Sequence, residues 1–140
     1  PTNYILSPFN DPTWGPLLIT RDPQELINKI NNLTADGGGD LPELYYHGLN
    51  DALQVCELDS LIYTFTDAPA KDAQLRPQVL GRAIQLNTRI FSFYVGGLSV
   101  FGRRRRRRDV YEELINGTDV ASASGGLTIG LSTGLADGNA

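Results

Sequence analysis

Two apolar runs of strand length, with one helix-length segment between them, constrain the fold of this chain more than any other feature. Residues 61–66 (LIYTFT) and 90–95 (IFSFYV) are rich in β-branched and aromatic side chains. Residues 77–86 carry apolar side chains at helical spacing, namely Val79, Leu80, Ala83 and Ile84. Strands that alternate with helices form parallel βαβ units, and uninterrupted apolar runs are typical of strands covered on both faces. The sequence therefore predicts an α/β fold with a doubly wound, mostly parallel sheet.

The segment before these runs opens with short strands and a helix. Residues 4–9 and 17–20 are apolar runs next to turn residues, so both are predicted to be strands. Asp22, Pro23 and Glu25 then combine a helix N-cap, a proline at the first helical position and an acidic residue three places after the cap. The apolar residues that follow share one helical face, and they are Leu26, Ile27, Ile30 and Leu33.

A second start signal predicts another amphipathic helix. Asp40, Pro42 and Glu43 repeat the pattern of an N-cap followed by proline and glutamate. The apolar face of this helix comprises Leu44, Leu49, Ala52 and Leu53. Downstream, residues 109–116 are predicted to form a short helix with an acidic start, and residues 127–131 a last strand.

Length and composition fit one folded domain. A chain of 140 residues with 41% hydrophobic and 20% charged residues is ordinary for a globular protein. We expect residues 1–131 to form the domain and residues 132–140 to be a flexible tail. One cysteine, Cys56, excludes an internal disulfide and a cysteine-rich zinc site. No run approaches the roughly 18 apolar residues of a membrane helix, and the lack of methionine favours a piece of a longer protein.

The charges are unevenly distributed. The formal net charge of -4 arises from 12 basic and 16 acidic residues, and six of the basic residues form one run. Without that run, 6 basic residues stand against 16 acidic ones, a balance of -10. The remaining surface is therefore predicted to be acidic and a poor match for nucleic acid. The run comprises Arg103, Arg104, Arg105, Arg106, Arg107 and Arg108.

Three roles are open for this arginine run. It could be a solvated loop between a strand and the following helix, because like charges repel one another and stay in water. It could bind a polyanion, such as a heparin-like glycan or an acidic partner surface. It could also be a basic processing site for secretory proteases.

Two carboxylates lie where predicted elements meet loops. Asp40 follows three glycines, and Asp67 follows the apolar strand of residues 61–66. Ligands of an open α/β sheet gather at the carboxyl ends of its parallel strands, so both residues are candidate ligands of one metal ion, Mg²⁺ or Mn²⁺. Each also has a simpler interpretation, because Asp40 could only cap the following helix and Asp67 could only form a turn. Phosphate binding at residues 37–39 is disfavoured, since Asp40 would repel an anion.

Several segments place the chain beside a known family. In order, the chain contains YILSPFNDPTWGPLLITRDPQEL, GGGDLPEL, SLIYTFTDAPAKD, DVYEELIN and ASGGLTI. Together they resemble a von Willebrand factor A (vWA) domain, in particular its hemicentin-like branch, over residues 4–129. The resemblance implies a Rossmann-like fold with a divalent metal ion at the top of the sheet. It matches Asp40 to the ligand of the family's second loop and Asp67 to the ligand of its third loop.

The resemblance also implies that the domain is truncated at both ends. The family's first metal loop carries Asp-x-Ser-x-Ser, and this chain has no such motif. The metal site is therefore expected to be incomplete here. The implied function is that of a secreted, extracellular matrix or adhesion-type module that binds protein partners. Asn32 and Asn116 begin Asn-x-Thr sequons, so they would carry glycans in a secreted glycoprotein.

Two other classes of function remain open. One is a structural protein that self-associates through exposed sheet edges. The other is a polyanion-binding protein that uses the arginine run. An enzyme is not expected, because no Ser-His-Asp spacing can be assigned. The only histidine, His47, is predicted to be a surface or half-buried helix residue.

Overall fold

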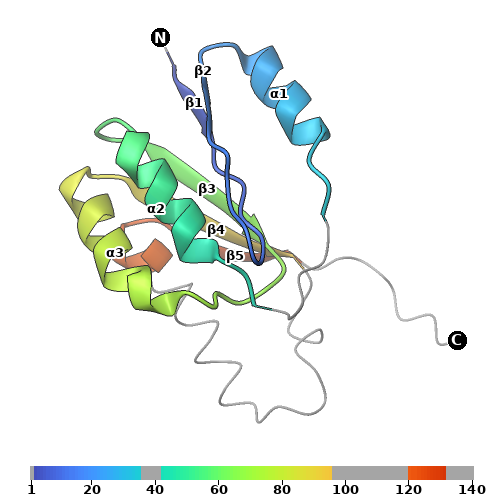
Figure 1. Ribbon diagram of the computed structural model, residues 1–140. Helices are drawn as coiled ribbons and strands as arrows, with labels where there is room; N and C mark the ends of the chain where they lie inside the picture. Colours follow the sequence, from blue (N-terminus) through green and yellow to red (C-terminus); the bar gives the residue numbers. More distant parts are fainter. Residues whose placement is uncertain (1, 36–41, 96–119, 132–140) are drawn as a thin grey trace, which may run out of the picture.

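The computed structural model describes residues 2–35, 42–95 and 120–131. The predicted helix over residues 109–116 and the predicted tail over residues 132–140 lie outside these ranges. The elements in chain order are β1 (Tyr4–Leu6), β2 (Leu18–Thr20), α1 (Pro23–Asn31), α2 (Tyr45–Val55), β3 (Leu61–Thr66), a 3-10 turn η1 (Ala73–Leu75), α3 (Arg76–Gln85), β4 (Arg89–Val95) and β5 (Thr128–Leu131) (Figure 1).

Strands β3, β4 and β5 form a parallel sheet in that order. β3 and β4 pair along their length, from Leu61 opposite Arg89 to Thr66 opposite Tyr94. Helix α3 connects them, which is the βαβ unit that the two apolar runs predicted. The predicted α/β class with a parallel sheet is confirmed.

Helices α2 and α3 cover one face of this sheet (Figure 1). Ile90 and Ser92 of β4 lie beneath them with no exposed surface. Leu53 of α2 and Val79 of α3 are equally buried and belong to the same core cluster. Each large apolar side chain buried in this way contributes about 1.5–3 kcal/mol. Of the residues predicted to form the buried face of α2, Leu49, Ala52 and Leu53 are buried, whereas Leu44 precedes the helix as its N-cap and is only half-buried.

The opposite face of the sheet is apolar and carries no helix in the described part of the chain. Tyr63 stacks on Phe91 and Phe65 on Phe93, with ring centroids 5.5 and 4.9 Å apart. Tyr63 and Phe65 nevertheless remain 55% and 62% exposed. The uninterrupted apolar runs predicted cover on both faces, and the described helices provide it on one. We call this surface the open sheet face, and it comprises Leu61, Tyr63, Phe65, Phe91, Phe93, Leu127 and Ile129.

Strands β1 and β2 form an antiparallel hairpin that is separate from the parallel sheet. β1 ends at Leu6, so the strand predicted over residues 4–9 is shorter than expected. Phe9 forms an isolated bridge with Trp14 inside the hairpin loop instead. Chain reversal within this loop ends the extended segment early.

Helix α1 starts as predicted, but its apolar face is largely exposed. The Asp22 carboxylate accepts a hydrogen bond from Gln24 N at 2.9 Å, which confirms the predicted cap. The apolar residues Ile27, Ile30 and Leu33 are 46–47% exposed, and no residue of α1 is buried. The reason is that α1 lies against the narrow hairpin of β1 and β2 rather than on the three-stranded sheet.

Candidate functional site

The loop after β3 carries the predicted metal ligand Asp67. At the end of β3, the buried Thr66 hydroxyl accepts a hydrogen bond from Ala68 N at 3.2 Å and lies 3.1 Å from Ala68 O. This turn buries Thr66 and Ala68 and leaves Asp67 exposed between them. The carboxylate is therefore accessible to a cation at the carboxyl end of a parallel strand, where the sequence predicted it.

The segment that leads into α2 pairs with the loop that follows Asp67. Glu43 and Ala70 form a parallel bridge. Glu43 N donates to Pro69 O at 2.8 Å, and Lys71 N donates to Glu43 O at 2.8 Å. These bonds join two loops from distant parts of the sequence at the carboxyl edge of the sheet.

Helix α2 begins at Tyr45, with Leu44 as its N-cap and no side-chain hydrogen bond from that cap. The prediction that Asp40 caps this helix is therefore wrong, since the helix starts later than its Pro42 and Glu43 signal suggests. Asp40 itself lies outside the described residues.

A carboxylate that is distant in sequence caps helix α2. Asp72, from the loop after β3, accepts hydrogen bonds from Tyr46 N at 3.0 Å and His47 N at 2.7 Å. Its side chain also lies 2.7 Å from His47 Nδ1 and is 1% exposed. A negative charge at a helix N-terminus is favourable, so Asp72 fixes α2 against the loop. Sequence reasoning missed this role, because nothing in the local pattern links residue 72 to residues 46 and 47.

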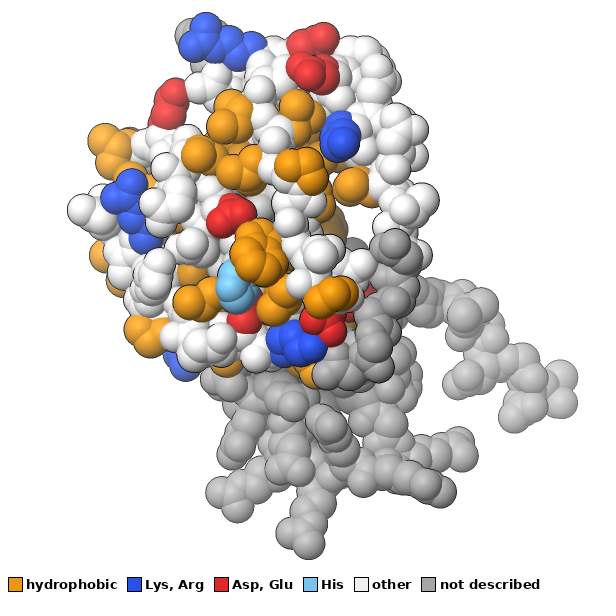
Figure 2. Space-filling model, viewed as in Figure 1, with side chains coloured by type: hydrophobic (Ala, Val, Ile, Leu, Met, Phe, Trp, Pro, Cys, Tyr) orange, Lys and Arg blue, Asp and Glu red, His pale blue; other side chains and the backbone are white. Residues whose placement is uncertain are grey.

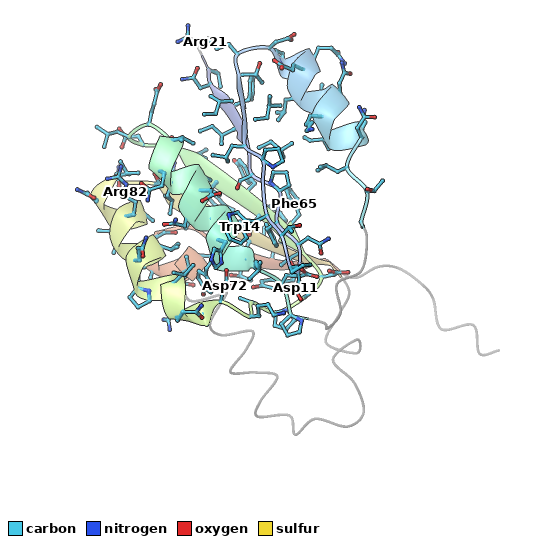
Figure 3. The ribbon with its side chains drawn as sticks, in the orientation of Figure 1. Asp11, Trp14, Arg21, Phe65, Asp72 and Arg82 are labelled. Atoms are coloured by element: carbon cyan, nitrogen blue, oxygen red, sulfur yellow. The ribbon has the colours of Figure 1, made fainter. Side chains whose placement is uncertain are left out.

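The hairpin loop packs on the same end of the molecule. The rings of Trp14 and His47 lie 4.2 Å apart, and Lys71 forms an ion pair of 2.6 Å with Asp11. Figure 3 shows Asp11, Trp14 and Asp72 gathered at this end, from the hairpin loop and the loop after β3. Trp14 is 43% exposed, and Figure 2 shows hydrophobic side chains beside the histidine on this surface. His47 is half-buried, as predicted.

Polar contacts beneath α2 are structural rather than reactive. Tyr45 OH lies 2.9 Å from Ser92 Oγ and 3.2 Å from Thr64 Oγ1, all buried between helix and sheet. Burial raises the pKa of Tyr45, and it also raises the pKa of Tyr46 and of Tyr94. These phenols therefore stay neutral at any physiological pH, and the Tyr45 hydroxyl ties α2 to the sheet.

The described residues do not complete a metal site by themselves. No group of three or more His, Cys, Asp or Glu that could hold a metal ion occurs within residues 2–35, 42–95 and 120–131. Mg²⁺ takes six oxygen ligands, usually one or two carboxylates with several waters. Asp67 fits as one such ligand, and it is the one predicted ligand that the structure describes.

The other predicted site residues fall into two groups. Asn32 is the C-cap of α1 and is exposed, so its sequon is accessible. Asn116 and the arginine run of residues 103–108 lie outside the described ranges. Within those ranges, no helix has the length and hydropathy needed to cross a membrane.

Fold and site together define an α/β domain whose parallel sheet presents a ligand-type carboxylate at its carboxyl edge. Residues 1–133 match the family model of the von Willebrand factor A domain, so the chain belongs to the vWA domain family. This membership confirms what the sequence motifs indicated. No solved structure gives a significant match to the chain.

Curated relatives fall into two kinds of protein. Hemicentin-1 of Mus musculus is 36% identical over 112 residues, which cover 80% of this chain and 2% of that protein. The von Willebrand factor A domain-containing protein 7 of Mus musculus is 38% identical over 136 residues, covering 92% of this chain and 15% of that protein. Its Homo sapiens counterpart is 39% identical over 107 residues. The chain thus spans a small part of the length of each relative.

Proposed function

We propose that this chain is an adhesion-type module that binds protein partners outside the cell, without catalysing a reaction. Its membership of the vWA family and its similarity to hemicentin-1 support this function. We assign the partner surface to the carboxyl edge of the sheet, where Asp67 and Trp14 are exposed. The His47–Asp72 pair supports binding over catalysis, because its carboxylate is occupied in capping α2.

We further propose that Asp40 and Asp67 are the ligands that this chain contributes to a Mg²⁺ or Mn²⁺ site. The observation that carries this proposal is the bridge between Glu43 and Ala70. Each of these residues is three positions from one of the two carboxylates, so the bridge joins the two loops that carry them. A partner carboxylate or a further loop would supply the remaining oxygen ligands.

Metal titration tests this assignment. With at most two protein carboxylates available, we expect the chain to bind Mn²⁺ weakly, with no submicromolar event in isothermal calorimetry. Asp67→Ala should abolish the weak heat, whereas Asp51→Ala, which changes a carboxylate within α2, should leave it unchanged. A submicromolar site that is lost in Asp67→Ala would show that the site is complete in this chain.

Self-association is the second candidate function, and the open sheet face favours it. Tyr63, Phe65 and Leu127 are 55–62% exposed on this surface. Contiguous exposed apolar surface of this kind is uncommon on monomers and is typical of interaction sites. Among the strands of the described residues, β3 is at the edge of its sheet, so it adds backbone groups that another chain could bind.

A further inference from the structure

The loop between β1 and β2 is held in place by backbone hydrogen bonds. Gly15 N donates to Pro8 O at 2.7 Å, which closes the loop on itself. Leu44 N donates to Asn10 O at 3.3 Å, which joins the loop to the N-cap of α2. These bonds fix the position of Trp14, so its ring is available to a partner without rearrangement of the loop.

Trp14 lies against the imidazole of His47, and a buried carboxylate determines how this imidazole bonds. The ring centroids are 4.2 Å apart, and His47 Nδ1 lies 2.7 Å from Asp72 Oδ2. Asp72 also accepts two backbone N–H bonds, and a carboxylate only accepts. The neutral imidazole therefore carries its proton on Nδ1 and presents a lone pair on Nε2. No described residue bonds to Nε2, and the His47 side chain is 28% exposed.

Negative charge surrounds these two rings. Asp51 follows His47 by four positions in α2, so both side chains lie on the same face of the helix. Figure 2 shows acidic side chains on both sides of the histidine. Lys71 is also at this end, but its ion pair with Asp11 offsets its charge. Outside the arginine run, the chain has 6 basic against 16 acidic residues. The partner group that fits here is therefore a cation that can lie on an aromatic ring and donate hydrogen bonds.

We propose that Trp14, His47 and Asp51, here called the arginine site, bind an arginine side chain of the protein partner. The guanidinium ion is planar and stacks on the indole of Trp14, which is 43% exposed. Its N–H groups donate to His47 Nε2 and to the Asp51 carboxylate, because both are acceptors. This inference rests on the partner surface proposed above and specifies which partner group is bound there. The interaction needs no metal ion.

The test is an NMR titration of the full chain with N-acetylarginine amide at pH 8 in the presence of EDTA. The control ligand is N-acetylcitrulline amide, in which an uncharged urea of nearly the same shape replaces the guanidinium. We expect saturable shifts of the Trp14 indole and the His47 ring with a Kd on the order of millimolar, and binding of the citrulline compound weaker by about tenfold or more. The chain has one tryptophan and one histidine, so both signals are unambiguous. Equal binding of the two compounds, or no saturable binding, would overturn the proposal. A neutral His47 ring with its proton on Nε2 would also overturn it.

Two variants locate the bound arginine by removing the same charge at different places. Asp51→Asn should weaken binding of the arginine compound by about fivefold or more, because a charged acceptor becomes neutral. Asp59→Asn should leave binding unchanged, since Asp59 lies in the turn before β3 and its positive φ of 62° suits asparagine. Equal weakening by both variants would overturn the proposal, because general charge would then attract the ligand. Failure of the arginine probe in EDTA is distinct from failure of the metal site, which the Mn²⁺ titration tests separately.

Discussion

Single residues show where local sequence patterns suffice and where they do not. Asp22 caps α1 from its own segment, so the pattern of cap, proline and glutamate predicted it. Asp72 caps α2 across 26 residues, and only the tertiary structure brings the carboxylate to Tyr46 N. The same distinction explains why Asp40 was wrongly predicted as the cap of α2. A local signal was present there, but the folded chain starts the helix at Tyr45.

Loss of the remote cap should cost more stability than loss of the local one. Asp72→Ala leaves two backbone N–H groups and His47 without their buried acceptor, so we expect the free energy of unfolding to fall by about 2–4 kcal/mol. Asp22→Ala removes one exposed cap bond and should cost about 1 kcal/mol or less. Urea denaturation followed by circular dichroism measures both values. Equal losses would contradict the role assigned to Asp72.

Two glycines should respond in opposite directions to the same substitution. A Cβ on Gly126 would overlap the Ile90 carbonyl oxygen, so Gly126→Ala must displace backbone just before β5 and cost about 3 kcal/mol or more. A Cβ on Gly81, inside α3, would meet nothing within 4 Å. Gly81→Ala should therefore stabilise the protein by about 0.5–1 kcal/mol through higher helix propensity. Thermal unfolding of the two variants distinguishes the signs, and a stable Gly126→Ala protein would contradict the close approach.

Among the elements, strongly patterned segments were predicted well and their burial less well. β3, β4 and α2 appear where apolar periodicity placed them, because each packs the pattern against a real neighbour. Helix α1 has an equally clear apolar stripe, yet its Ile27 and Ile30 stay about half exposed. Periodicity reports which side of a helix is apolar, but it does not report how much surface lies opposite that side.

The difference between the two helices can be measured with one pair of truncations. Leu53→Ala removes a side chain of α2 that has no exposed surface, so it should lower the free energy of unfolding by about 2–5 kcal/mol. Ile27→Ala shortens a side chain of α1 that is 47% exposed and should cost about 1 kcal/mol or less. Both values come from urea denaturation. A loss in Ile27→Ala as large as that in Leu53→Ala would mean that the stripe of α1 is buried in solution.

For the whole molecule, the sequence predicted the class of the fold and the position of one carboxylate at a strand end, but not how distant segments meet. Asp67 lies at the strand end where the apolar run placed it. The bridge of Glu43 with Ala70 and the separation of β1 from β3 depend on long-range pairing, which no local spacing encodes. The sequence predicted the parallel sheet. Its open face results from helices α2 and α3 both lying on the opposite side of the sheet, which the sequence did not predict.

That open sheet face leads to the last prediction, which concerns association between copies of the chain. Apolar surface on Tyr63, Phe65 and Leu127 is costly to leave in water, so we expect dimers or larger species at micromolar concentration in sedimentation velocity. Phe65→Lys places a charge within this face and should weaken association by about tenfold or more, because a buried unpaired charge opposes contact.

Leu58→Lys is the matched control. Leu58 is 68% exposed but lies in the turn before β3, outside the open sheet face, so its variant should associate like the unmodified chain. Both lysines replace exposed side chains, so urea denaturation should show similar stability, which separates loss of association from loss of folding. A chain that sediments only as a monomer would refute the proposed self-association. Equal weakening by both lysines would mean that general charge, rather than the open sheet face, controls association.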